Sequence, residues 1–120
     1  AHKLLLIDEA AVIQQLHAYL QTLDFPNTAF YLSKDNYLEV THKHVSKEHA
    51  LLEVANHYQI PLEQVMTIGD NFNDLPMLRM AGLGVAMGNA PQEVKEDART
   101  ETYSNNQHGV AKAIEKYVLI

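Results

Sequence analysis

The pattern of apolar and polar positions changes along the chain, and the first of its two patterns extends to about residue 43. An apolar run at 4–7 predicts a buried strand, and apolar positions three or four residues apart over 11–23 predict a helix. Residues 28–32 and 37–41 alternate apolar and polar side chains, which is typical of two strands joined by a four-residue hairpin loop. We therefore expect an α+β unit at the start of the chain.

Beyond this region, short apolar runs alternate with helical patterns. Pro76 falls in the first turn of one such helix, where its missing N–H removes no hydrogen bond. Helices and strands that alternate with short connections are typical of a parallel sheet between helical layers, so the second part predicts a Rossmann-like α/β fold. The expected elements are a helix over 46–60, a strand at 65–68, a helix over 73–81, a strand at 84–87, a helix from about 91, a strand at 99–103 and a helix over 108–117.

Composition narrows the class of protein. The chain has 120 residues, of which 47% are hydrophobic and 20% charged, the profile of a soluble globular domain. A formal net charge of −6 argues against a nucleic-acid binder and against attachment to an anionic membrane surface. The sequence shows neither a membrane span nor a secretion signal, so we expect a cytoplasmic protein. Because cysteine is absent, disulfides, thiolate zinc sites and cysteine nucleophiles are excluded.

Polar residues that follow the strand at 65–68 are the first candidates for chemistry, because ligands bind open parallel sheets beyond the carboxyl ends of the strands. Here the chain reads Gly69-Asp70-Asn71-Phe72-Asn73-Asp74. Mg²⁺ takes oxygen ligands, commonly one or two carboxylates with water and phosphate, so Asp70 is the natural metal ligand. A simple turn uses the same residue types, with Asn73 or Asp74 capping the next helix, and composition alone does not separate the two interpretations.

Lys47 is the second candidate. It directly follows Ser46, a potential cap, at a helix N-terminus, where the helix dipole favours an anion over a cation. A lysine there makes sense if its ammonium meets a phosphate or a carboxylate. A solvated lysine on a surface helix is the alternative.

Four segments, taken in order, are recognisable. They are Tyr37-Leu38-Glu39-Val40, then Val45-Ser46-Lys47 with Ala50-Leu51, then Gly69-Asp70-Asn71-Phe72-Asn73-Asp74-Leu75-Pro76-Met77-Leu78, and finally Gly84-Val85-Ala86-Met87-Gly88-Asn89-Ala90. In order and spacing, the stretch from Tyr37 to Val118 resembles the C-terminal part of the haloacid dehalogenase superfamily, specifically its Cof-type phosphatases with a large cap. The resemblance covers about two thirds of the chain.

This resemblance implies a Mg²⁺-dependent phosphate-monoester hydrolase that acts on small phosphorylated metabolites through an aspartyl-phosphate intermediate. It assigns catalytic roles to Lys47 and Asp74, phosphate or substrate binding to Lys47 and Asn73, and the Mg²⁺ ligand to Asp70. Lys47 would neutralise the nucleophile and the phosphoryl group. Such a set is chemically sensible, because phosphoryl transfer depends mostly on positioning and charge neutralisation.

The nucleophile of this superfamily lies in an Asp-x-Asp motif, which this chain lacks. Asp8 follows an apolar run as a nucleophile should, yet no second aspartate stands two positions later. The resemblance assigns residues 1–43 to the C-terminal portion of an α+β cap and residues 44–120 to the second half of the catalytic core. The first half of the core would then be missing, and the chain alone would be inactive.

A half-core exposes a sheet edge and apolar surface, so we expect self-association or pairing with the missing N-terminal half. A non-catalytic half-domain that self-associates or docks on a partner is the alternative from another class. A receiver-like phosphorylation domain is a third alternative, since it also needs clustered acidic residues and a lysine.

His42 and His44, two positions apart, would share a strand face and could hold a transition metal, although no third ligand is adjacent.

Overall fold

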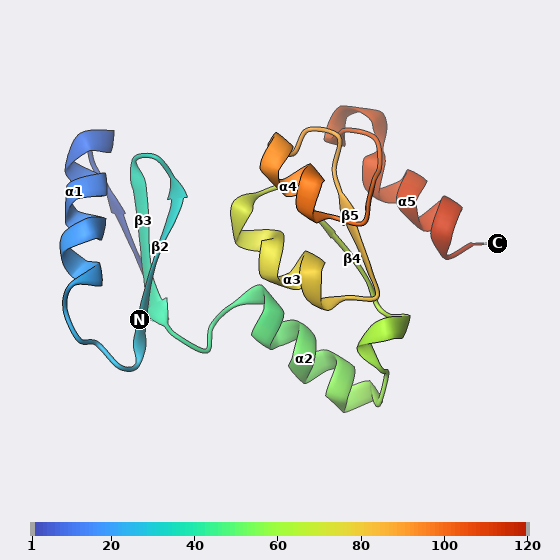
Figure 1. Ribbon diagram of the computed structural model, residues 1–120, viewed down its shortest axis with the longest axis horizontal. Coiled ribbons are helices and arrows are strands. Elements are labelled where there is room, and N and C mark those ends of the chain that lie inside the picture. Colours follow the sequence, from blue (N-terminus) through green and yellow to red (C-terminus); the bar gives the residue numbers. More distant parts are fainter. Residues whose placement is uncertain (1, 120) are drawn as a thin grey trace. The chain divides into compact units, whose positions relative to one another are not determined.

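The computed structural model describes residues 2–119, which form two compact units that divide between Ser46 and Lys47 (Figure 1). Each unit has a three-stranded sheet of its own. The division lies close to the expected boundary between 43 and 44, while the assignment of the first unit to a cap stays a prediction. No helix in this described part of the chain is long and apolar enough to cross a membrane.

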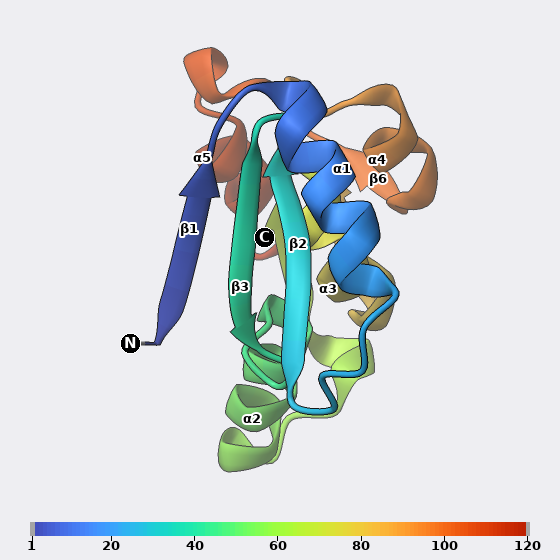
Figure 2. The ribbon, with the colours of Figure 1, turned by 90° about the vertical axis from the view of Figure 1, so that its left-hand side faces the viewer.

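The first unit is an antiparallel sheet with one helix. The strands lie in the order β1 (Lys3–Ile7), β3 (Tyr37–His42), β2 (Thr28–Lys34). Helix α1 (Ala10–Gln21) packs on β2 and β3, as Figure 2 shows. Ile13 of α1 and Leu38 of β3 are the buried apolar side chains among the described residues of this unit. The region has the α+β character that its pattern predicts.

Two expectations for this unit are wrong. Strand β1 is not buried: all five of its residues are exposed, because β1 pairs only with β3 among the described strands while α1 packs on β2 and β3. The hairpin loop contains two residues, Asp35 and Asn36, rather than four. Strand β2 continues to Lys34 through an irregularity in register after Leu32, which absorbs the extra residue as a bulge does.

The second unit is a parallel sheet flanked by helices, as the sequence predicts. Both strand pairs, β4 with β5 and β5 with β6, are parallel. Figure 1 shows α3 and α4 on one side of β4 and β5, and α5 on the other. The predicted α/β fold class is confirmed. The elements are α2 (Lys47–Tyr58), β4 (Met66–Gly69), α3 (Leu75–Met80), β5 (Leu83–Ala86), α4 (Gln92–Asp97), β6 (Thr100–Glu101) and α5 (Gly109–Tyr117), with 3-10 turns at Leu62–Gln64, Phe72–Asp74 and Asn105–Gln107.

The core of this unit lies between β5 and the helices α3 and α4. Leu78, Ala86 and Val94 are almost fully buried and form one cluster with Ala90. Strand β5 is the middle strand, so its backbone bonds to a neighbour on each side and its last three residues are buried. This packing fixes the ends of the strands, from which the polar loops emerge.

Two boundaries in the second unit differ from the expectation. Strand β6 has only two residues instead of the run 99–103, although Thr102 N–H still donates to Ala86 O at 2.9 Å and Tyr103 O accepts Gly88 N–H at 3.1 Å. Beyond Glu101 the chain therefore still bonds to the last residue of β5, Ala86, and to Gly88 in the loop after it. The helix expected from residue 73 begins instead with the 3-10 turn Phe72–Asp74, and this tighter turn places Asp74 inside the protein.

Candidate functional site

The loop that carries most of the predicted site residues leaves the sheet at the carboxyl end of β4, immediately after Gly69. The absence of a side chain at Gly69 makes room for Asp74, because a Cβ built on Gly69 would lie 2.6 Å from the Cβ of Asp74. Any larger residue would push Asp74 out of its place. The Gly-Asp pair therefore has a packing reason besides its chemical one.

Asp74 is a buried carboxylate whose two oxygens both accept hydrogen bonds from the protein. Oδ2 accepts the backbone N–H of Asp70 at 2.8 Å and of Asn71 at 3.0 Å, and Oδ1 accepts the ammonium of Lys47. Burial raises the pKa of the Asp74 carboxyl, but the hydrogen bonds from Lys47, Asp70 and Asn71 outweigh it, so the pKa is lowered from its usual value. Asp74 is thus ionised at neutral pH and fixes the shape of the loop.

Lys47 is the first residue of α2, and its ammonium forms an ion pair with Asp74. A lysine at this helix start was expected to contact a phosphate or a carboxylate, and Lys47 contacts the carboxylate of Asp74. About half of the lysine side chain, 52%, remains exposed, whereas the Asp74 side chain is 3% exposed. An ammonium has three N–H donors, so Lys47 can contact a second anion while it keeps its bond to Asp74.

The loop is also a capped turn: Asn71 caps the 3-10 turn, and Asp74 occupies the N-cap position of α3 without a side-chain capping bond to that helix. Asn71 Oδ1 accepts the N–H of Phe72 at 2.8 Å, while Asp74 reaches back to the N–H of Asn71, which completes a capping box. The turn interpretation and the site interpretation therefore apply to the same residues. Asp74 closes the turn with one oxygen and holds Lys47 with the other.

Asp70 differs from Asp74 because its carboxylate is exposed at the rim of the loop. Its Oδ2 accepts a hydrogen bond from Asn89 Nδ2 at 3.3 Å. An exposed carboxylate oxygen fits Mg²⁺, which in phosphoryl-transfer sites takes one or two protein carboxylates with water and phosphate. Residues 2–119 contain no group of three or more His, Asp or Glu side chains that could hold a metal alone. Asp70 can therefore offer Mg²⁺ one carboxylate ligand, whereas the described residues offer no complete set of carboxylate and histidine ligands.

Asn73 lies in the middle of the 3-10 turn, between Phe72 and Asp74, and is exposed. Within the described part of the chain its side-chain amide makes no hydrogen bond. The amide is therefore available to an external acceptor, as phosphate binding requires.

Asn89 has no role predicted from the sequence, yet its side chain joins two loops of the site. Its Oδ1 accepts the backbone N–H of Asn105 at 2.9 Å, and its Nδ2 is the donor to Asp70. The preceding Gly88 allows this close approach, because a Cβ there would lie 2.8 Å from the nitrogen of Ser104. The available signal was a Gly-Asn pair after β5, at the same edge of the sheet as the Gly-Asp pair after β4.

The other sequence candidates lie in the first unit. Asp8 follows an edge strand of the antiparallel sheet, and its Oδ1 accepts the N–H of Glu9 at 2.7 Å. The rings of His42 and His44 have centroids 5.3 Å apart, and His42 Nδ1 accepts the His44 N–H at 3.2 Å. No third metal ligand joins this pair among residues 2–119. None of these three residues belongs to the Asp74 network.

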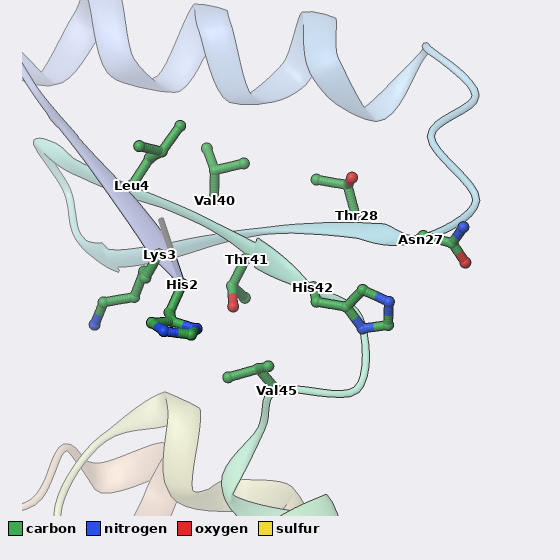
Figure 3. A pocket seen from close by; sticks show the side chains of 9 residues that line it. All are labelled: His2, Lys3, Leu4, Asn27, Thr28, Val40, Thr41, His42 and Val45. Carbon is green, nitrogen blue, oxygen red and sulfur yellow. The ribbon is translucent and has the colours of Figure 1, made fainter.

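The first unit also contains an open pocket of about 420 Å³ near the beginning of β1 and the end of β3. Thr41 is its most buried lining residue, and the Thr41 hydroxyl is the one buried side-chain polar atom without a partner among the described residues. In Figure 3 the Thr41 side chain points toward Val45 and away from α1, on the opposite side of β3 from Val40. Of the sequence candidates, His42 lines this pocket, whereas Lys47, Asp70, Asn73 and Asp74 do not. The lining residues are His2, Lys3, Leu4, Asn27, Thr28, Val40, Thr41, His42 and Val45.

Known proteins match this chain along most of its length. The family described as haloacid dehalogenase-like hydrolase matches residues 1–114. A Haemophilus influenzae protein provisionally named a phosphatase is 41% identical over 115 residues, which is 96% of this chain and 44% of that protein. The 5-amino-6-(5-phospho-D-ribitylamino)uracil phosphatase of Bacillus subtilis is 46% identical over 82 residues, which is 68% of this chain and 33% of that enzyme.

Solved structures agree with these matches. The crystal structure of a haloacid dehalogenase-like hydrolase from Bacteroides thetaiotaomicron superposes with a TM-score of 0.82 at 33% identity, over 96% of this chain and 43% of that one. The chain thus spans less than half the length of the relatives it matches. The resemblance to Cof-type phosphatases, inferred from the four segments, is confirmed, and the chain belongs to the haloacid dehalogenase-like hydrolase family.

Proposed function

We propose that this chain is the C-terminal part of a Mg²⁺-dependent phosphate-monoester hydrolase. In this proposal residues 1–43 are the end of a cap and residues 44–120 are the second half of the catalytic core. Family membership and the 44% share of the Haemophilus relative support it. The lack of an Asp-x-Asp motif supports a nucleophile that lies outside these 120 residues, so the chain alone would be inactive.

The observation that carries the proposal is the carboxylate of Asp74, which binds Lys47 and the backbone of the Asp70 loop at once. It thereby holds an ammonium beside a loop that also presents an exposed carboxylate and a free amide. Lys47 would neutralise the phosphoryl group, Asn73 would donate to a phosphate oxygen and Asp70 would hold Mg²⁺. When bound, Mg²⁺ supplies charge neutralisation and Lewis-acid polarisation of the phosphoryl oxygens.

Asp74 acts through other groups in this scheme. Both of its oxygens already accept hydrogen bonds, and its side chain is 3% exposed. It is therefore placed neither to attack phosphorus nor to exchange a proton with substrate. We assign it the narrower role of a positioning residue for Lys47 and for the loop.

The proposed reaction has two steps. A carboxylate outside this chain attacks phosphorus, the bond from phosphorus to the substrate oxygen breaks, and the leaving alkoxide takes up a proton from a general acid that also lies outside this chain; the attacking water of the second step returns that proton. Water then cleaves the acyl phosphate, which releases inorganic phosphate and restores the carboxylate. In both steps the transferred phosphoryl group carries its negative charge on three equatorial oxygens, which is where the Lys47 ammonium and the Asn73 amide would act.

The substrate class proposed is a small phosphorylated metabolite, in line with the name of the Bacillus subtilis relative. The absence of cysteine is compatible with a cytoplasmic setting. As partner we propose the part of the protein that carries the nucleophile, with self-association of the chain when that part is absent. Exposed apolar residues support this, namely Val110 (48%) and Ile114 (37%), one turn apart on α5, and Val118 (55%), directly after the helix.

The test is Mg²⁺-dependent hydrolysis of p-nitrophenyl phosphate by the 120-residue chain, together with its Asp8→Ala and Asp70→Ala variants. We expect no turnover by any of the three, and we expect Mg²⁺ to shift the Asp70 loop in the ¹⁵N–¹H spectrum of the chain but not of Asp70→Ala. Turnover that is lost in both variants would make Asp8 the nucleophile and overturn the cap assignment. Mg²⁺ shifts that persist in Asp70→Ala would remove Asp70 as the metal ligand and favour the non-catalytic half-domain.

A further inference from the structure

Asn89 is the one side chain that bonds both to the proposed metal ligand and to another loop of the second unit, among the hydrogen bonds described for residues 47–119. Its amide donates to Asp70 Oδ2 at 3.3 Å and accepts from Asn105 N–H at 2.9 Å. Asp70 follows β4, Asn89 follows β5, and Asn105 lies in the turn after β6. A single side chain therefore ties together the three loops at one edge of the parallel sheet.

The orientation of the Asn89 amide follows from its partners. The backbone N–H of Asn105 can only donate, so the atom of Asn89 that faces it must be the carbonyl oxygen. The NH₂ group is then turned toward Asp70, where an ionised carboxylate can only accept. The backbone of the loop after β6 thus decides which group Asp70 meets.

We propose that Asn89 is a positioning residue that sets the orientation of the Asp70 carboxylate for a cation. Its donor occupies Oδ2 of Asp70 and leaves Oδ1 for the ion. This inference rests on the proposed role of Asp70 as Mg²⁺ ligand. Partners that hold a ligating carboxylate commonly contribute to metal affinity although they never touch the metal.

A purely structural role predicts a different behaviour. Asn89 and Asn105 are both exposed, so water can replace their 2.9 Å bond, and the bond from Asn89 to Asp70 is long; the contribution of Asn89 to folding stability is therefore small. A residue that orients a metal ligand should instead change the affinity for the metal while the free energy of unfolding stays nearly constant. Cation affinity, measured without any turnover, therefore separates the two roles.

The experiment is a Mg²⁺ titration of the 120-residue chain, followed through the ¹⁵N–¹H signals of Asp70 and Asn71, for the wild type and for Asn89→Ala and Asp70→Ala. We expect Asn89→Ala to weaken Mg²⁺ binding about tenfold, and Asp70→Ala to abolish it. Urea unfolding of Asn89→Ala should have the wild-type midpoint.

Residue 105 offers a matched pair of variants. Asn105→Pro removes the N–H that orients Asn89, and the turn accepts proline because Asn105 opens a 3-10 turn and Ser104 is extended, with φ −70° and ψ 168°. Asn105→Ala keeps that N–H and loses only the hydrogen bond that Asn106 N–H donates to Asn105 Oδ1 at 3.0 Å. We expect Asn105→Pro to weaken Mg²⁺ binding about threefold, and Asn105→Ala to leave it unchanged.

The outcomes are distinguishable. If Asp70→Ala abolishes binding while Asn89→Ala binds Mg²⁺ like the wild type, the role of Asn89 is overturned and the proposed metal site stands. Equal effects of Asn105→Pro and Asn105→Ala would remove the backbone N–H from the explanation and contradict the orienting role. A wild-type chain that gives no Mg²⁺ shift, or one that Asp70→Ala leaves intact, would overturn the proposed metal role of Asp70 and this inference with it.

Discussion

The two units of this chain treat apolar and charged side chains in opposite ways. The first unit leaves every residue of β1 exposed, including Leu4 at 55% and Ile7 at 57%, whereas in the second unit the Asp74 side chain is only 3% exposed. Although β1 is exposed, Ile13 of α1 and Leu38 of β3 are buried. Burial of Asp74 is tolerated because three donors compensate for the lost water. The exposed strand adds little to the core of the first unit, whereas the buried carboxylate is part of the fold of the second.

Removal of the buried carboxylate should have the largest effect. Asp74→Ala leaves the N–H groups of Asp70 and Asn71 without their acceptor and Lys47 without its partner, so we expect a loss of about 3 kcal/mol in the free energy of unfolding. Urea unfolding measures it. The control is Asp97→Ala, which breaks the exposed ion pair with Arg79 and should cost at most about 0.5 kcal/mol. An equal loss of unfolding free energy in the two variants would show that the buried position of Asp74 adds nothing to the stability.

Crowding at Gly69 should have the next largest effect. Gly69→Ala places a Cβ 2.6 Å from that of Asp74 and should destabilise the chain by about 2 kcal/mol. In an Asp74→Gly background the opposing Cβ is gone, so the same substitution should cost clearly less. Unfolding of the two single variants and the double variant gives the coupling. Additive costs would mean that Gly69 is needed for a reason unrelated to Asp74.

The charge of Asp74 should also give the stability a pH dependence. The pKa of this carboxyl is lower in the folded chain than the usual 3.8, so the unfolded chain binds more protons between the two values. Its contribution is therefore complete above the usual value and is lost as the pH falls through the folded value. Asp74→Asn should be less stable at neutral pH and show a flatter acid limb in unfolding experiments. An unchanged acid limb would assign the pH dependence to other carboxyls.

Changes on β1 should have the smallest effect on stability. Ile7→Thr keeps a β-branched side chain at an exposed position and should alter the free energy of unfolding by no more than about 0.5 kcal/mol. Leu38→Ala, in the core of the same sheet, should cost about 3 kcal/mol. Thermal unfolding of both variants tests the contrast. A large cost at Ile7 would mean that this edge is packed in solution.

Sequence patterns were sufficient where local rules decide the structure. The helices, the parallel sheet and the grouping of Lys47 with the Asp70 loop follow from periodicity, capping and the resemblance to a family. The prediction that β1 is buried was wrong, because a short apolar run in the sequence does not distinguish a central strand from an edge strand.

The part of the site that escaped prediction depends on contacts between distant loops. Asn89 is nineteen positions from Asp70 and sixteen from Asn105, and only the register of β4, β5 and β6 brings the three together. The orientation of the Asn89 amide depends on a single backbone N–H. Neither feature has a local signature beyond the Gly-Asn pair.

The double use of Asp74 has an entropic consequence. Its carboxylate fixes the backbone of Asp70 and Asn71 and the position of the Lys47 ammonium before any ligand arrives. The conformational freedom that a flexible loop would lose on binding a phosphate and a cation is therefore already lost when the chain folds. The loop of the second unit is therefore pre-organised for binding, and the conformational entropy lost in ordering it lowers the free energy of unfolding instead of the affinity.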